Sequence, residues 1–275
     1  MHIGLLKVED VSEENLEDIF KICARAFEIP PHNKFDHLLY EKGMEVRRRW
    51  LIDALRKRGP CAKIAYLDGR PRAQIVFCPE EMMPHIREPR GDVISILCMY
   101  NPFPEAQRKG VATALVEDLL GECDSGLSCL RGPCRFLVTA PFPPDGPTLI
   151  EFYKKHGFRR GRGEMYREVR GKYLPRETPE YTPRPEDLEK TVILYNPACE
   201  WGYFYAFKVV DLIKERDPDH PVEIFDIWER PEEYMRRTLH RVTAGRAIVK
   251  GRVMSGGIFW TDREAFIREL ERALR

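Results

Sequence analysis

Hydrophobic and polar residues follow two different periods along the first 60 positions of the chain. Residues 2–10 have the pattern of a strand. From Ser12 onward apolar residues return every three or four positions, which predicts a helix with acidic residues in its first turns. A second helix, rich in arginine, is predicted from about Tyr40 to Lys57, where Arg58-Gly59-Pro60 ends it.

The next 40 residues have the pattern of a sheet. Two strands, 61–67 and 72–78, flank the dipeptide Asp68-Gly69. Both central positions of a tight type I′ hairpin turn need positive φ, so this dipeptide predicts a hairpin. The run DVISILCMY at 92–100 is continuously apolar and rich in β-branched residues, which predicts a strand buried on both faces.

Helices and strands then alternate up to residue 170. The pattern predicts a helix at about 110–120, a strand at 134–140, a short helix at 148–157 and a strand at 163–169.

Residues 171–190 separate this first unit from a second one. They contain four prolines and many charges, which is typical of a linker. The sequence therefore predicts one domain at 1–170, a linker at 171–190 and a second domain at 191–275. In the second domain the predicted elements are strands at 191–195 and 221–227, helices at about 203–216 and 231–241, a hairpin within 247–259 and a helix at 262–274.

Charge and hydropathy exclude several classes of protein. The 45 basic and 44 acidic residues give a net charge of +1, so no global field attracts nucleic acid or an anionic membrane surface. No apolar run approaches the roughly 20 residues that span a bilayer, and the first 15 residues lack the apolar region of a signal peptide. We therefore expect a cytoplasmic protein with no membrane or nucleic-acid partner.

The eight cysteines are mostly embedded in apolar runs, which is typical of reduced thiols in the core of a cytoplasmic protein. Cys123, Cys129 and Cys134 are separated by five and four residues, whereas a zinc site usually has C-x2–4-C pairs and a fourth ligand, and the nearest histidine, His156, is distant in sequence. We therefore predict no metal site.

The turn Gln107-Arg108-Lys109-Gly110-Val111-Ala112 places two cations beside two small residues where a helix begins. The first amides of a helix have no partner within the helix, and its dipole is positive at that end. This turn is therefore a candidate phosphate-binding site. The alternative is a helix start that carries two solvated charges.

The order of these segments resembles the GNAT superfamily of acyl-CoA-dependent N-acyltransferases. Strand DVISILCMY is followed by QRKGVATALVEDLL, strand CRFLVTA and helix LIEFYKKHGF. QRKGVA is similar to the pyrophosphate-binding signature of that family, and FYKKHGF is similar to its second motif. The resemblance covers residues 1–170 and implies an α/β fold with a mixed, mostly antiparallel central sheet flanked by helices.

The resemblance also implies a chemistry. Acetyl-CoA is the donor substrate, and a primary amine attacks its thioester directly in a ternary complex. Tyr153 matches the family tyrosine that protonates the departing thiolate, and the alternative is an aromatic residue that only packs at a helix end. The pantetheine arm pairs with a strand, and the pyrophosphate lies on the amides of the turn. The positions implied for acetyl-CoA are Leu97, Cys98, Met99, Arg108, Lys109, Gly110, Val111, Ala112 and Thr113.

Three carboxylates are candidates for the general base. Glu80 and Glu81 follow one strand, and Asp92 opens the next. The alternative for each of them is a solvated charge at a strand end. The chain also departs from the family pattern, because PFPPDGPTLIEFY lacks the asparagine that many members carry shortly before the tyrosine.

The second domain resembles a thioredoxin-like unit, and its attachment to the first resembles the YoaP-type architecture. Cys199 follows a strand and precedes a helix, where the helix N-terminus is expected to acidify a thiol. Gly202 stands where a C-x-x-C motif needs its second cysteine, which favours a binding or structural module. The alternative function is a thiol-redox, CoA-binding or scaffold protein that uses Cys199.

The acceptor stays open at this point. An amino acid, an aminoglycoside, a polyamine and a protein N-terminus are all primary amines compatible with the resemblance. Exposed strand edges also leave a homodimer open.

Overall fold

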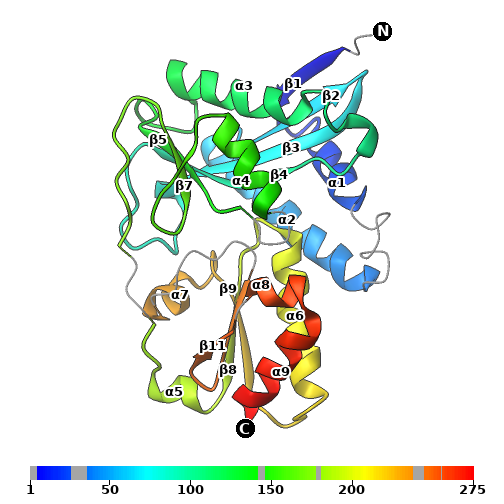
Figure 1. Ribbon diagram of the computed structural model, residues 1–275, viewed down its shortest axis with the longest axis vertical. Helices are drawn as coiled ribbons and strands as arrows, with labels where there is room; N and C mark the ends of the chain where they lie inside the picture. The colour runs from blue at the N-terminus through cyan, green and yellow to red at the C-terminus, as the bar shows by residue number, and fades with distance from the viewer. Residues whose placement is uncertain (1–4, 26–35, 142–145, 178–180, 238–244, 255) are drawn as a thin grey trace.

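The structure is a computed structural model that describes residues 5–25, 36–141, 146–177, 181–237, 245–254 and 256–275, and it contains two sheets (Figure 1). The larger sheet has the order β1-β2-β3-β4-β5-β7-β6, and only the β4–β5 pair is parallel. The expected mixed, mostly antiparallel sheet flanked by helices is therefore confirmed. Its strands are β1 Leu6–Asp10, β2 Ala62–Leu67, β3 Arg70–Pro79, β4 Val93–Tyr100, β5 Phe136–Thr139, β6 Arg159–Arg160 and β7 Met165–Glu168.

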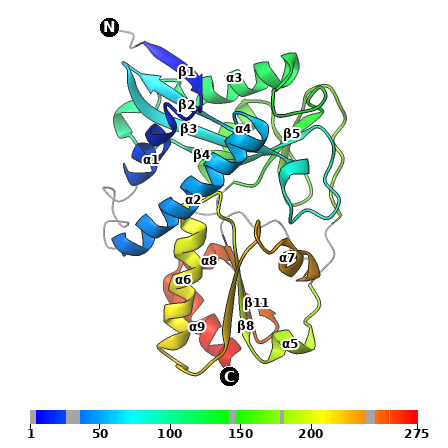
Figure 2. The same ribbon diagram turned by 180° about the vertical axis from the view of Figure 1, so that it is seen from behind.

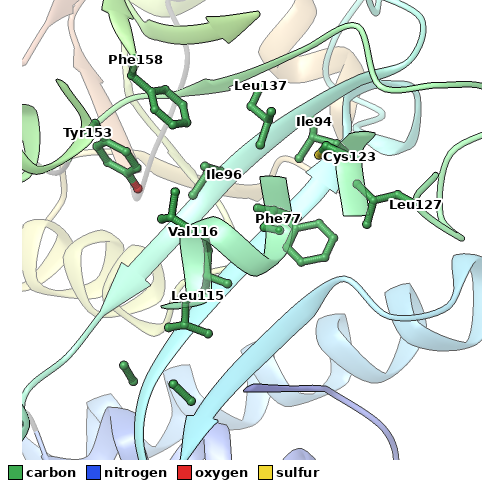
Figure 3. Packing of buried hydrophobic residues seen from close by; sticks show 14 of the residues in the cluster. Phe77, Ile94, Ile96, Leu115, Val116, Cys123, Leu127, Leu137, Tyr153 and Phe158 are labelled. Atoms are coloured by element: carbon green, nitrogen blue, oxygen red, sulfur yellow. The ribbon is translucent and has the colours of Figure 1, made fainter. Parts of the chain in front are cut away.

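Helices cover both faces of the larger sheet. On one face α3 and α4 pack over Phe77, Ile96 and Leu137, which Figure 3 shows at close range. On the other face α1 and α2 pack over Ile64 and Val76, and Figure 2 shows α2 lying across the sheet. The helices of this part are α1 Leu16–Ala24, α2 His37–Arg58, α3 Val111–Ser125 and α4 Gly146–Lys155, with 3-10 turns η3 Glu80–Met82 and η4 Pro104–Ala106.

The smaller sheet has the order β11-β10-β8-β9, with β8 parallel to β9. Helices α6, α8 and α9 pack with β10 around Tyr205, Phe259 and Phe266. Its elements are α5 Pro185–Leu188, β8 Thr191–Tyr195, α6 Glu200–Lys214, β9 Val222–Asp226, α7 Pro231–Arg237, β10 Gly245–Val249, β11 Arg252–Val253, α8 Gly256–Thr261 and α9 Arg263–Leu274.

Local signals placed most elements correctly, and the Asp68-Gly69 hairpin is confirmed. Asp68 has φ 53° and Gly69 has φ 71°, as a type I′ turn requires. The first helix, however, begins at Leu16 and not at Ser12. The reason is that the Asn15 side chain accepts the Ser12 N–H at 2.8 Å, and this local turn delays the helix.

The hairpin expected within 247–259 is only partly correct. Its second strand stops at Val253, and residues 256–261 form α8. Phe259 thereby enters the core against Phe266, with ring centroids 5.2 Å apart. Burial of this aromatic residue on a helix outweighs continuation of the short strand. The helix expected at 231–241 ends at Arg237 in the described part, and residues 238–241 lie outside the described residues.

The two parts of the chain that carry these sheets meet where the start of α6 packs against α2 (Figure 2). A Cβ added at Gly43 of α2 would lie 2.7 Å from the carbonyl oxygen of Glu200, so the two backbones approach as closely as glycine permits. Ala198, just before α6, belongs to the core of the larger sheet. Residues from both parts of the chain therefore share one packed junction.

Candidate functional site

Strands β4 and β5 part halfway along β4. Their parallel pairing runs from Val93 opposite Phe136 to Ile96 opposite Thr139, where β5 ends, while β4 continues to Tyr100. Within the described residues, β5 therefore offers no partner to positions 97–100. An extended molecule can pair with a strand edge of this kind.

A β-bulge lies at the point of this divergence. Val76 of β3 pairs with Cys98 and Phe77 pairs with Ile96, so Leu97 is the extra residue of β4. Bulges of this kind turn the backbone locally and are frequent beside active sites. The positions that the resemblance assigns to pantetheine, 97–99, begin at this bulge.

The turn before α3 has the geometry of an anion site. Arg108 has φ 60° and Gly110, the N-cap, has φ 77°, so the backbone folds sharply into Val111. The first helical bond is donated by the Ala114 N–H to the Gly110 carbonyl at 2.8 Å. The amides of residues 110–113 precede that bond and need partners from outside the helix.

The space above this turn is open. A Cβ at Gly110 would meet no atom of the described residues within 4 Å, and the side chains of Arg108 and Lys109 are exposed. Since η4 and the turn follow directly from the end of β4, the amides and the bulge lie on consecutive parts of the chain. The arrangement provides a strand edge for an extended arm and a cationic helix start for its phosphates.

Tyr153 lies on α4, on the same face of the sheet as α3. It is 2% exposed, and its ring centroid is 5.0 Å from that of Phe158. Figure 3 shows its ring beside Val116 and Ile96, and Ile96 is the last residue of β4 that pairs with β5. Tyr153 thus packs in the core next to the divergence of the strands, and its role there stays a prediction.

The predicted carboxylates lie at the other end of β4. Because β3 is antiparallel to β4, Pro79 pairs with Ile94, and Glu80 follows at once. Four to five residues of strand, about 13–16 Å at roughly 3.3 Å per residue, separate this end from the bulge. A general base must reach its proton directly or through one water. The structure does not bring Glu80, Glu81 and Asp92 together with Leu97.

Two of these carboxylates have structural partners. Glu80 is 1% exposed and forms ion pairs with Arg90, at 2.5 Å, and with Arg176 from the expected linker. Asp92 accepts the Gly132 N–H at 3.0 Å. Glu81 is exposed. Glu80 therefore holds the segment around Arg176 against the end of β3.

A buried polar cluster that sequence reasoning missed lies on the face of the sheet covered by α2. Arg47 is 1% exposed, and its Nη1 donates to Glu200 Oε2 at 2.7 Å and to Cys23 Sγ at 2.6 Å. Its Nη2 donates to Gln74 Oε1 at 3.3 Å, and the Tyr40 hydroxyl donates to Glu200 Oε1 at 3.2 Å. The signal was the helical spacing of Tyr40 and Arg47 on the apolar face of α2, which placed an arginine among core residues.

Cys199 is the N-cap of α6, as expected, but its thiol is not acidified there. Burial raises the pKa of the Cys199 thiol, and the nearby Glu200 carboxylate raises it further. Since the thiolate is the reactive form, this environment opposes the reactivity that its position at a helix start suggested. Within the described residues no group of three or more His, Cys, Asp or Glu side chains is arranged to hold a metal ion.

Comparisons with known proteins found similarity among solved structures only. No family model and no curated protein matches the chain. PaiA N-acetyltransferase from Thermoplasma acidophilum in complex with coenzyme A is 12% identical, with 60% of this chain and 99% of that chain covered and a TM-score of 0.44. Ard1 from Thermoplasma volcanium is 15% identical, with 60% and 97% covered and a TM-score of 0.41.

A GNAT family acetyltransferase from Brucella melitensis in complex with acetyl-CoA is 16% identical, with 62% and 92% covered and a TM-score of 0.40. The structural neighbours over about 60% of the chain are thus acetyltransferases. In the described parts of the chain, no helix is both long and apolar enough to cross a bilayer.

Proposed function

We propose that the chain is an acyl-CoA-dependent N-acyltransferase that transfers an acetyl group from acetyl-CoA to a primary amine. The observation that carries this proposal is the bulge at Leu97, where β4 leaves β5 and its free edge leads to the helix start at Gly110. A strand edge followed by open helical amides fits an extended arm that ends in a pyrophosphate.

The residues of the site take the following roles in this proposal. Backbone groups at 97–99 pair with the pantetheine arm, and a strand N–H at Cys98 or Met99 stabilises the oxyanion. The amine nitrogen forms the new bond to the carbonyl carbon while the C–S bond breaks. Tyr153 donates its phenolic proton to the departing sulfur, since a phenol of pKa about 10 matches a thiolate of similar basicity. The proton that the attacking nitrogen loses passes to water, and water returns a proton to the tyrosinate.

The part of the chain at 191–275 is proposed to be a thioredoxin-like module that follows the domain at 1–170 and the linker at 171–190. The element order β8-α6-β9-α7-β10-β11 agrees with that interpretation over the described residues. A thiol-redox function has less support, because Gly202 replaces the second cysteine and burial raises the pKa of Cys199.

Thermal unfolding with acetyl-CoA tests the proposal. A ligand at about 100 times its Kd stabilises the folded state by about 2.7 kcal/mol. For a chain of this size we expect Tm to rise by roughly 5–10 °C. Gly110→Asp places a carboxylate above the amides, where a Cβ meets nothing within 4 Å in the described part of the chain, and should abolish that rise.

Gly110→Ala is the matched control. It imposes left-handed strain at φ 77°, at least as large as that of aspartate, without adding a charge, so the variant loses stability but keeps a shift with acetyl-CoA. If the wild-type protein shows no shift at millimolar acetyl-CoA, the proposed function is wrong.

A further inference from the structure

Two buried N–H groups on one face of α2 have no hydrogen-bond acceptor among the residues that the structure describes. They are Arg47 Nε and Trp50 Nε1, on side chains of residues that are 1% and 6% exposed. Residues three apart on a helix are neighbours on its surface. A buried donor without an acceptor costs about 1–3 kcal/mol, so each of these two N–H groups favours a ligand that brings an acceptor oxygen to it.

These donors lie at the level of the bulge, on the opposite face of the sheet from α3. Arg47 binds Gln74, whose partner across the sheet is Tyr100, while Val76 pairs with Cys98. Trp50 belongs to the hydrophobic cluster that Leu97, Cys98 and Tyr100 pack against. The two donors therefore belong to α2, on the side of β4 that faces away from α3.

The counter-charge of Arg47 comes from Glu200, the first residue of α6, which packs beside the smaller sheet. Glu200 neutralises the guanidinium, and Tyr40 holds the second oxygen of the same carboxylate. The guanidinium and carboxylate charges balance, and Arg47 Nε is still available as a donor. A ligand oxygen at this place would accept a hydrogen bond from the charged guanidinium of Arg47. The ligand need not neutralise that charge, because Glu200 already does so.

We propose that the acceptor amine carries a carbonyl-type oxygen on its neighbouring carbon, as in an α-amino acid or the first residue of a peptide. Arg47 Nε and Trp50 Nε1 bind this oxygen, and the amine lies toward the thioester at the bulge. The inference rests on the proposed function and names its substrate class. A free α-amino acid and a peptide N-terminus share this chemistry, because each has an amine next to a carboxylate or an amide carbonyl.

The test compares three amines that share a side chain. The first set is phenylalanine, phenylalaninamide and phenethylamine. Two matching sets are built in the same way from alanine and from lysine. CoA release gives kcat/KM for each amine. We expect at least one set in which the carbonyl-bearing members exceed the plain amine by tenfold or more. Preference for the acid identifies a free amino acid as acceptor, and preference for the amide identifies a peptide N-terminus.

Trp50→Phe keeps the ring and deletes the N–H, so the preference for the carbonyl-bearing amine over the plain amine should fall about fivefold, through KM. Trp228→Phe is the control, because it changes a ring of the same aromatic pair, 5.3 Å from Trp50, whose Nε1 already donates to Asn196 Oδ1 at 3.1 Å. Its preference should equal that of the wild type.

The outcomes separate the two proposals. If acetyl-CoA gives no thermal shift, the proposed function fails and the inference fails with it. If acetyl-CoA binds but no carbonyl-bearing amine is acylated, or plain amines are acylated equally well, only the inference is overturned. Equal effects of Trp50→Phe and Trp228→Phe on the preference would also overturn it.

Discussion

Replacement of Gly43 by alanine tests whether the junction between the two sheets is as tight as the structure indicates. The new Cβ would lie 2.7 Å from the Glu200 carbonyl oxygen, and contacts below 3.4 Å are rare for a real Cβ. Since 3.4 minus 2.7 is 0.7, the start of α6 has to move away from α2 by about 0.7 Å. The three nearest atoms all belong to the Glu200 backbone, so no side chain can rotate to relieve the contact.

Two effects of opposite sign compete in this variant. Alanine in a helix interior is about 1 kcal/mol more favourable than glycine. Overpacking costs about 1–3 kcal/mol, and a displaced Glu200 also weakens its 2.7 Å contact with the buried Arg47. Breaking a buried pair of this kind costs about 3–5 kcal/mol. Partial loss of the pair therefore outweighs the helical gain, and we expect a net destabilisation of about 1–4 kcal/mol.

Urea unfolding followed by circular dichroism measures this difference in free energy. Gly121→Ala is the matched control, because Gly121 lies within α3 and a Cβ there meets nothing within 4 Å. The control should gain about 0.5–1 kcal/mol. The reasoning about the junction is refuted if Gly43→Ala is as stable as Gly121→Ala.

Two further predictions concern titrating groups. Burial lowers the pKa of His220 below its usual 6.5, so the unfolded chain binds the proton first, and stability should fall as pH drops below about 7. His220→Gln should flatten that slope in urea titrations from pH 5 to 8, and an unchanged slope would contradict the assignment. Because the pKa of Cys199 is raised, iodoacetamide should modify it slowly at pH 7 and faster above pH 9, as peptide mass spectrometry can follow. Rapid modification at pH 7 would restore the redox alternative.

The sequence predicted those features that depend on neighbouring residues. The turn at 107–112 and the apolar strand at 92–100 are local patterns, and both were found where expected. The bulge at Leu97 was not visible, because it arises from the register between β3 and β4. Strand register depends on packing across the whole sheet, which no local pattern records.

The polar cluster was missed for a related reason. Arg47 and Glu200 are 153 positions apart, and nothing near either residue announces its partner. Glu80 illustrates the opposite case. Its place beside a strand end indicated either a solvated charge or a base, whereas Arg176, 96 positions away, makes it a buried ion-pair member. Long-range pairs of this kind require the fold before their function can be inferred.

Hydrogen exchange with and without acetyl-CoA tests the central claim most directly. The amides at 97–99 and 110–113 belong to the bulge and the helix start that are proposed to hold the donor. We predict that acetyl-CoA slows exchange in both segments and leaves η3, residues 80–82, unchanged. Binding without protection at 97–99 and 110–113, or protection confined to the smaller sheet, would contradict the proposed site.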